Sequence, residues 1–179
     1  MCLDVEKGVV WFYVVITIPY AKLLSPRVAF CLTIAWSGKA VITRGDMFMK
    51  GFVQNIGALS SGNTDFRHVL YTARNMQLVL MAIQPGEDIG EEVHKDRDQF
   101  FRVEKGEGEV WIDGVRTRIE PETAMIIPAG VRHNVRNTGK QLLQLYTIYA
   151  PPEHADGTVR STKAEAEASE EHYDGRTTE

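Results

Sequence analysis

The chain has 179 residues, enough for one domain of ordinary size with additional segments. Its hydrophobic fraction of 44% and charged fraction of 25% are typical of a globular protein in water. The net charge of -4 provides no basic surface of the kind that binds a nucleic-acid backbone. The only cysteines are Cys2 and Cys31, so the rest of the chain has neither a disulfide framework nor a thiolate metal site.

Residues 1–46 differ in composition from the rest of the chain. Val9–Ile18 is continuously apolar and Val28–Trp36 is a second run, but neither reaches the roughly 20 residues of a membrane-spanning helix. The first seven residues are net acidic, which does not fit the basic start of a secretory signal. Three interpretations stay open: an interfacial or signal-anchor helix, an extra element packed on the main domain, or an N-terminal apolar extension that is non-native and arises from a misplaced start codon. Met47 and Met49, where domain-like patterning begins, favour the last interpretation.

Residues 47–152 are predicted to form one domain made of β-strands. Runs of β-branched and aromatic residues alternate with turn signals such as Pro85-Gly86, Asp113-Gly114 and Pro128-Ala129-Gly130. We expect strands at 75–84, 99–104, 109–112, 115–119, 123–127, 131–136 and 142–149. Lys105–Gly108 has the composition of a hairpin turn between the second and third of them. Many short strands and no convincing helix indicate an all-β sandwich or closed barrel.

The composition changes again after Pro151-Pro152. Thr162 to Glu165 fits a helix capping box, and the Ala/Glu-rich residues that follow predict a helix over 163–172. Residues 153–179 are therefore interpreted as a short C-terminal helix followed by an acidic tail, without chemistry of their own.

Polar residues stand at regular spacing in two segments of the β-region. Glu92 and His94 are two residues apart, so both side chains point to the same face if the segment is extended. Gln99 opens the next predicted strand, and His133 follows a Pro-x-Gly turn much later in the chain. In a small closed barrel, which has room for one small ligand, these four side chains can meet inside.

The same residues carry a resemblance to the cupin superfamily. Its two motifs are G-x5-H-x-H-x3-4-E-x6-G and G-x5-P-x-G-x2-H-x3-N. The residues of this chain that stand in register with them are Gly86, His94, Gly106, Pro128, Gly130, His133 and Asn137. The departures are Glu92 for the first His, Gln99 for the Glu and Glu122 for the opening Gly of the second motif. The resemblance implies a single-domain cupin double-stranded β-helix (a jelly-roll barrel), of the small type often labelled mannose-6-phosphate isomerase-like.

The resemblance also implies a divalent metal ion held by Glu92, His94, Gln99 and His133. Two imidazoles and one carboxylate match the facial triad of non-haem iron sites, and Gln99 is a weaker fourth ligand or a hydrogen-bonding neighbour. The usual family set of three His and one Glu carries one negative charge, and so does this set. The expected metal is Mn, Fe, Zn or Ni. Glu92 is the candidate catalytic base if it does not bind the metal.

The phase of the strands predicts what lines the barrel. If Gln99 faces inward, Phe101 and Val103 do as well, and Tyr146 or Gln144 of the last strand is expected to join them as the substrate pocket. In the same phase Arg102 and Arg132 face outward. The strands that can be phased therefore supply no inward cation, which disfavours a phosphorylated substrate. The cations left to reach the mouth are Arg67, Arg74 and loop lysines.

The first functional hypothesis is a metal-dependent enzyme, isomerase-like or dioxygenase-like, on a small organic or sugar-like substrate. The alternatives are a non-catalytic small-molecule-binding module and a structural barrel, because the fold alone does not decide function. His68, His154 and His172 match no motif and are expected to take no part. The expected partners are the substrate and a second copy of the chain in a homodimer, with no nucleic acid and no membrane. The expected location is cytoplasmic.

Overall fold

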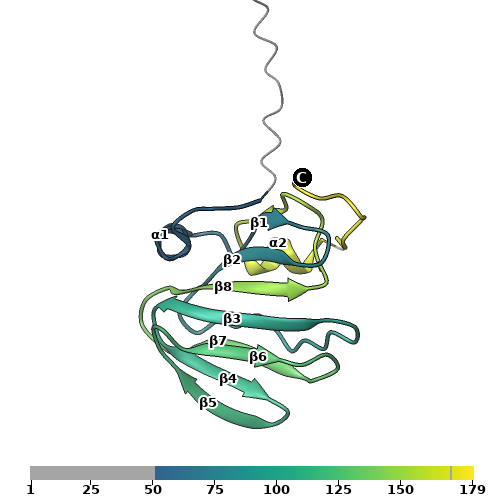
Figure 1. The fold of residues 1–179 in the computed structure, drawn as a ribbon. Helices are drawn as coiled ribbons and strands as arrows, with labels where there is room; N and C mark the ends of the chain where they lie inside the picture. The colour runs from purple at the N-terminus through teal and green to yellow at the C-terminus, as the bar shows by residue number, and fades with distance from the viewer. Residues whose placement is uncertain (1–50, 170) are drawn as a thin grey trace, which may run out of the picture. The chain divides into compact units, whose positions relative to one another are not determined.

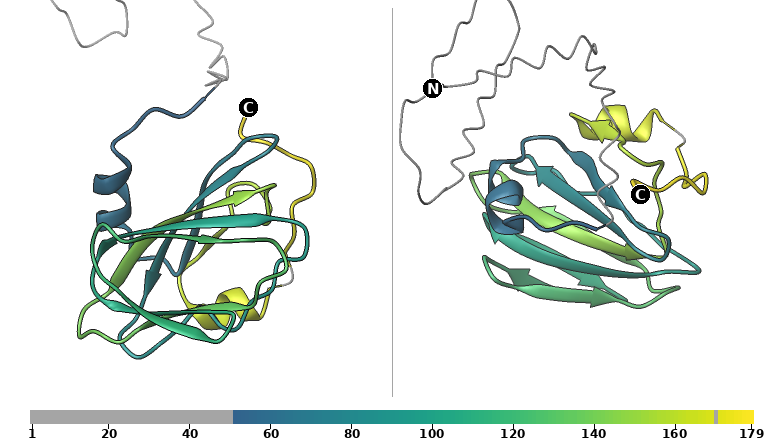
Figure 2. Two further views of the ribbon diagram at one scale, coloured as in Figure 1. Left: turned by 60° about the horizontal axis from the view of Figure 1, so that its bottom comes forward. Right: turned by 45° about the horizontal axis from the view of Figure 1, so that its top comes forward.

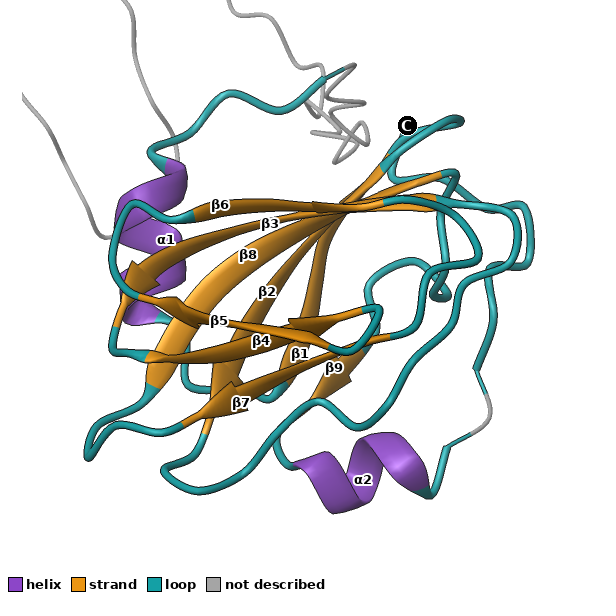
Figure 3. Ribbon diagram, turned by 90° about the horizontal axis from the view of Figure 1, so that it is seen from below, coloured by secondary structure: helices purple, strands orange, loops and turns teal. Residues whose placement is uncertain are grey.

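The computed structural model describes residues 51–169 and 171–179, so the interpretations of residues 1–46 lie outside the described residues. The described part contains nine strands and two short helices. The strands form two antiparallel sheets, of six and three strands (Figure 1). Viewed from below, the two sheets face each other with their inner surfaces together (Figure 3). The predicted all-β jelly-roll fold with a short C-terminal helix is confirmed.

The larger sheet has the strand order β6-β3-β8-β2-β1-β9. Its strands in chain order are β1 (Arg67–Thr72), β2 (Gln77–Ile83), β3 (Asp98–Lys105), β6 (Ala124–Ile127), β8 (Leu143–Ala150) and β9 (Val159–Arg160). Burial alternates along β3, because successive side chains of a strand point to opposite faces. The inner faces of β3 and β8 are in register, with Val103 opposite Leu145 and Phe101 opposite Thr147.

The smaller sheet has the order β5-β4-β7, formed by β4 (Gly108–Ile112), β5 (Val115–Ile119) and β7 (His133–Asn137). Asp113 and Gly114, with φ of 48° and 80°, make the two-residue turn between β4 and β5, as predicted. Residues 88–92 continue this sheet beyond β7, because isolated bridges join Asp88 to Arg136 and Glu92 to His133. The segment that carries Glu92 is therefore fixed against β7.

The space between the sheets is apolar at one end and polar at the other. The apolar part consists of fully buried side chains from both sheets, among them Ile83, Phe101, Val103, Ile119, Val135, Leu143 and Leu145. Each contributes about 1.5–3 kcal/mol to folding. At the other end, a buried polar row crosses the large sheet, with Gln99 opposite Tyr149 and Tyr149 opposite Gln77. The apolar end thus stabilises the barrel, and the polar end contains the side chains that could bind a ligand.

Lys105–Gly108 does not form the predicted hairpin. β3 pairs with β6 and β8, whereas β4 pairs with β5 and β7, so the chain crosses here from one sheet to the other (Figure 2). Gly106 has a φ of +87°, and a Cβ on it would lie 2.4 Å from the carbonyl oxygen of Leu142. The glycine is needed because another loop packs directly against it, not because a hairpin turns there.

Helix α1 (Ile56–Gly62) was not predicted. It begins at Asn55, whose side chain accepts a hydrogen bond from the backbone N–H of Ala58 at 3.0 Å. An Asn before a helix satisfies one of the free N–H groups of the first turn. This helix shows that the region 47–152 is not β-structure throughout.

Helix α2 (Lys163–Glu167) begins as the capping box predicts, with the Thr162 hydroxyl accepting from the N–H of Glu165. It ends at Glu167 instead of continuing to residue 172. After this helix, Ser169 contacts Arg160 and returns the chain to β9. The helix is therefore shorter than its composition predicts, since tertiary context commonly overrides helix propensity. In the described part of the chain, no helix has the length and apolar character needed to cross a membrane.

Candidate metal centre

Backbone pairing brings Glu92 and His133 together. The Glu92 N–H donates to the His133 carbonyl at 2.9 Å, and the His133 N–H donates to the Glu92 carbonyl at 3.0 Å. Residues that exchange both hydrogen bonds lie directly opposite each other, with their side chains on the same face. The Glu92 Oε2 atom accordingly lies 3.6 Å from the His133 Nε2 atom.

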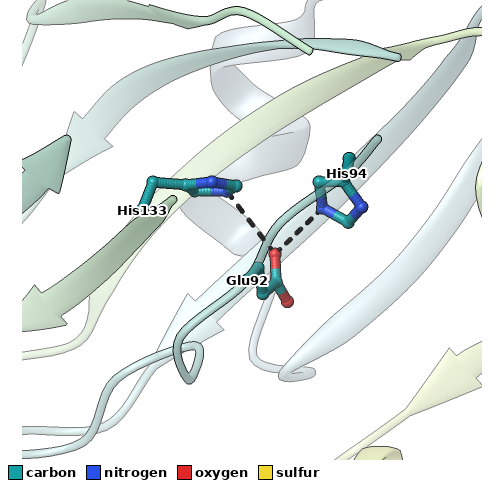
Figure 4. A group of neighbouring side chains, drawn as sticks. All are labelled: Glu92, His94 and His133. Atoms are coloured by element: carbon teal, nitrogen blue, oxygen red, sulfur yellow. Dashed lines mark hydrogen bonds and ion pairs between the residues drawn. The ribbon is translucent and has the colours of Figure 1, made fainter. Parts of the chain in front are cut away.

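His94 lies on the same side as Glu92, as their two-residue spacing predicts. Its Nε2 atom is 3.2 Å from the Glu92 Oε2 atom, and its ring centre is 5.6 Å from that of His133. The His94 carbonyl accepts the N–H of Gly130 at 2.7 Å, which ties this segment to the turn before β7. The Glu92 carboxylate therefore lies between two imidazole rings from different segments (Figure 4).

Gln99, near the start of β3, completes the group and is 1% exposed. Its Oε1 atom lies 3.0 Å from the His133 Nε2 atom, and its Nε2 atom donates to the Thr147 hydroxyl at 3.1 Å. The bond to Thr147 turns the amide so that its carbonyl oxygen faces the imidazole. All four side chains singled out in the sequence are thus neighbours, and we call Glu92, His94, Gln99 and His133 the donor cluster.

The second nitrogen of each imidazole is held by an acceptor outside the cluster. The His133 Nδ1 atom lies 3.2 Å from the Val131 carbonyl, and the His94 Nδ1 atom lies 3.5 Å from a carboxylate oxygen of Glu153. Glu153 is itself 2.7 Å from the guanidinium of Arg97. Each Nε2 atom also faces an acceptor, Glu92 Oε2 for His94 and Gln99 Oε1 for His133. The acceptor at Nδ1 would keep a proton there when a metal ion takes the Nε2 atom. Both Nε2 atoms face the Glu92 carboxylate.

Burial and neighbouring charges set the protonation of the cluster. Burial by itself lowers the pKa of His94, but hydrogen bonds to Glu153 and Glu92 outweigh it and raise that pKa to about 9. The pKa of His133 is lowered, chiefly by burial. Burial raises the pKa of Glu153, yet its hydrogen bond to His94 and the charge of Arg97 lower that pKa overall. His94 therefore carries a second ring proton at neutral pH, which a metal ion at its Nε2 atom would have to replace.

The spacing of the donor atoms suits one divalent metal ion. Two ligand atoms, each about 2.1 Å from a metal and at right angles, are about 3 Å apart. The separations here are 3.2 and 3.6 Å from Glu92 to the two imidazoles and 3.0 Å from Gln99 to His133. The ligand atoms of Glu92, His94 and His133 all lie within 4.8 Å of one another. Two imidazoles, a carboxylate and an amide oxygen form a donor set that fits Fe, Mn, Ni or Zn.

The predicted pocket residues have different surroundings. Phe101 and Val103 are fully buried on the inner face of β3, and the Phe101 ring lies 6.1 Å from that of His133. Tyr146 does not line the interior. It lies on the outer face of β8 beside Phe100, at 6.1 Å between ring centres. Its prediction as a pocket residue is therefore wrong, because the inward-facing positions of β8 are shifted by one residue from those expected. The inward residues near that end of β8 are Thr147 and Tyr149.

Two of the side chains around the cluster were missed by sequence reasoning. Tyr149 is 2% exposed and lies edge-on to His94, with 5.5 Å between ring centres. Burial raises its pKa, so its hydroxyl keeps the proton. Glu153 belongs to a segment that was expected to have no chemistry. Strand alternation from Gln99 and its partner strand could have found Tyr149, but no local signal identifies Glu153.

The donor cluster is only partly exposed. The side chains of Glu92 and His94 are 21% and 15% exposed, whereas that of His133 is fully buried. Two surface hollows of the described part lie elsewhere, one around Gly106 and Pro121 and the other around Gly86 and Lys163. Neither hollow is lined by a member of the donor cluster.

Comparison with known proteins agrees with this architecture. Residues 79–149 match the family model described as a cupin domain. The uncharacterised protein YrkC of Bacillus subtilis (strain 168) is 44% identical over 128 residues, which span 68% of this chain and 69% of that protein. The chain belongs to the cupin family. Among solved structures, the cupin resembles BH2720 from Bacillus halodurans, with 46% identity and a TM-score of 0.67 over 68% of this chain and 96% of that one. The mannose-6-phosphate isomerase-like subtype stays a prediction.

The structure explains how this cupin keeps its fold while departing from the second motif. Glu122 stands where that motif opens with glycine, and it keeps a positive φ of 73°. A non-glycine residue in this conformation costs about 1–2 kcal/mol. The N–H of Glu122 donates to the Val103 carbonyl at 2.9 Å, and the N–H of Val103 donates to the Thr123 carbonyl at 3.0 Å. These paired hydrogen bonds hold the turn against β3 despite the strain.

Proposed function

We propose that this cupin is a metal-dependent enzyme acting on a small organic substrate. The observation that carries the proposal is the convergence of two imidazole Nε2 atoms on the Glu92 carboxylate, while both Nδ1 atoms are held by protein acceptors. Such pre-oriented imidazoles are typical of metal ligands. A metal ion would be held by Glu92, His94, His133 and Gln99, and catalysis would require a position on it that these donors leave unfilled.

When bound, the metal would act as a Lewis acid that polarises a carbonyl or hydroxyl group of the substrate. The residues of the chain orient this chemistry. Glu153 and the Val131 carbonyl fix the two imidazoles, and Thr147 fixes the Gln99 amide. Phe101 lies beside His133 and excludes water from the deep side of the site. If Glu92 does not bind the metal, its partly exposed carboxylate is the candidate base.

Two reaction classes use such a centre. The set of two His and one carboxylate favours an iron-dependent, dioxygenase-like reaction. A carboxylate beside the metal favours an isomerase-like proton transfer instead. We propose a small neutral, carboxylated or sugar-like substrate for either class, since the side chains of Glu92 and His94 are only partly exposed.

The alternative is a non-catalytic cupin that binds a small molecule. It is favoured by the segment after β8, because Glu153 contacts His94 and Arg97 donates to the Pro152 carbonyl. If this segment stays in place, the cluster would bind a ligand or a metal without turnover.

The experiment uses the full chain loaded separately with Fe, Mn, Ni or Zn. Small oxo acids, hydroxy acids and sugars are incubated with it while oxygen uptake and product formation are followed by electrode and NMR. Turnover that is lost in His133→Ala supports the enzyme, and oxygen consumption with Fe alone identifies the dioxygenase-like class. Saturable ligand binding without turnover under every metal contradicts the enzyme and supports the binding module.

We also propose that the protein is a homodimer through the outer face of the large sheet. Ile126 of β6 is 68% exposed there, and the neighbouring outer positions of β3 and β8 carry the half-buried Phe100 and Tyr146. An apolar outer face of this kind is commonly covered by a second copy. Light scattering of the native chain and of Ile126→Lys tests this, since a monomeric native chain would contradict it. The cytoplasmic location stays a prediction.

A further inference from the structure

A second buried polar group lies beside the donor cluster, around β1 and β9. Arg67 and Arg160 are direct cross-strand partners in these strands. Arg67 lies two residues before Val69, which is buried in the core opposite Val79, so both side chains point to the inner face of the sheet. The side chain of Arg67 is accordingly only 13% exposed. β1 was not among the predicted strands, so the sequence could not predict that Arg67 faces inward. Like charges directly opposite in a sheet repel each other, so the arginine pair needs an anion.

The anion it contacts comes from the C-terminal segment. One carboxylate oxygen of Glu171 lies 3.4 Å from Arg67, and the other lies 2.5 Å from Arg160. Arg160 also donates to the Ser169 hydroxyl at 2.8 Å. The Glu171 side chain is 11% exposed, so a charged group reaches an interior site from outside the barrel strands.

The site has more polar atoms than Glu171 satisfies. His154 is 6% exposed, and neither of its ring nitrogens has a hydrogen-bond partner among the described residues; its Nδ1 atom lies 3.8 Å from Glu171. The Nε atom of Arg67 is also buried and unpaired within the described part. Nearly all buried polar atoms in proteins are paired, so the unpaired Nε–H of Arg67 and the unpartnered ring of His154 indicate capacity for a larger or differently oriented anion. Burial lowers the pKa of His154, so its neutral ring offers the anion one N–H donor.

The site is one aromatic ring away from the donor cluster. Tyr149 lies edge-on to His154 at 5.2 Å between ring centres, and edge-on to His94 at 5.5 Å. Glu153, the residue before His154, contacts His94 directly. A molecule with an anionic group among the arginines would thus have its remaining atoms near the donor cluster.

We propose that Arg67, Arg160 and His154 form a binding site for the carboxylate or phosphate group of a small ligand, and that Glu171 is an internal occupant that this ligand displaces. The site does not depend on a bound metal. The carboxylate of Glu171 is tethered, so it competes with free anions at an effective concentration in the millimolar range or above. Displacement would release the chain after Ser169 from the barrel.

The test begins with Glu171→Ala in the full chain, which removes the internal carboxylate. We expect its melting temperature to fall and to be restored saturably by acetate or by inorganic phosphate at constant ionic strength. The two anions distinguish a site shaped for a carboxylate from one shaped for a phosphate. Binding measured by calorimetry should be at least about tenfold tighter than in the native chain. Glu167→Ala is the matched control, because its exposed carboxylate pairs only with Lys163 among the described residues.

Two outcomes would overturn the proposal. The first is equal anion stabilisation of Glu171→Ala and of Glu171→Ala/Arg160→Gln, because phosphate also stabilises proteins non-specifically. The second is a failure of either anion to act on the native chain. In that chain the Tyr173 N–H donates to the Glu153 carbonyl at 2.8 Å, and displacement of Glu171 should break this hydrogen bond. The anion that rescues the variant should accelerate hydrogen exchange over residues 171–179 of the native chain. If neither anion binds the native chain or accelerates this exchange, Glu171 is a permanent structural partner and no ligand displaces it.

Discussion

Glu92 and His133 are aligned by their backbones and not by their side chains, since each donates its N–H to the carbonyl of the other at 2.9 and 3.0 Å. The carboxylate and the imidazole therefore face each other without contributing to the strand pairing that holds them. A change at either side chain should leave this strand pairing intact, although truncating the fully buried His133 costs stability. The donor cluster can thus be tested by substitution without unfolding the barrel.

Glu92→Gln is expected to weaken binding of a divalent metal by at least about tenfold, because a neutral amide replaces the anionic oxygen of the cluster. Glu91→Gln is the matched control, since its neighbouring carboxylate is 62% exposed and pairs with Arg132 on the surface. Calorimetric titration of the metal-free proteins measures both. Equal affinities in the two variants would exclude Glu92 as a ligand.

Glu153→Gln should lower metal affinity by about 10–100-fold although Glu153 is not itself a proposed ligand. The loss arises because Glu153 holds the Nδ1 atom of His94 at 3.5 Å and so directs its Nε2 atom toward the cluster. Glu120→Gln, whose side chain is 66% exposed, provides the comparison. An unchanged affinity in Glu153→Gln would show that His94 is oriented by other contacts.

Glu153 and Arg67 also show where sequence reasoning ends. His94, His133 and Gln99 could be predicted, because motif spacing and strand alternation are local properties of the chain. The contact between Glu153 and His94 depends on how the segment after β8 returns over the barrel, and that path follows from tertiary packing. Tyr146 was misassigned because β8 was placed in the wrong phase, and a shift of one residue exchanges the two faces of a strand.

Metal affinity should rise with pH through the neutral range. The pKa of His94 is raised to about 9, so the metal-free protein carries a proton on His94 that binding must release. Below that pKa, one released proton corresponds to a gain of about tenfold in affinity per pH unit, and the gain ends above it. Calorimetry in buffers of different ionisation enthalpy counts the proton. The metal affinity is measured at pH 6 and at pH 8. An affinity that is equal at the two pH values would contradict metal binding by His94.

Gly106→Ala should destabilise the fold much more than Gly114→Ala. Both glycines have positive φ, of +87° and +80°, which costs about 1–2 kcal/mol for alanine. A Cβ on Gly106 would also meet the Leu142 carbonyl at 2.4 Å, whereas a Cβ on Gly114 meets nothing within 4 Å. Overpacking adds about 1–3 kcal/mol. Urea unfolding gives both free energies, and equal losses would show that the loop at Leu142 yields without cost.

The most direct test of the central claim is the metal content of the full chain. The native protein and His94→Ala/His133→Ala are purified without added metal and subjected to elemental analysis, with His68→Ala as the control outside the cluster. The account predicts about one Fe, Mn, Ni or Zn per native chain and per control chain, and none in the double variant, which should remain folded. A native protein that contains no metal and takes up none when Fe, Mn, Ni or Zn is added would contradict it.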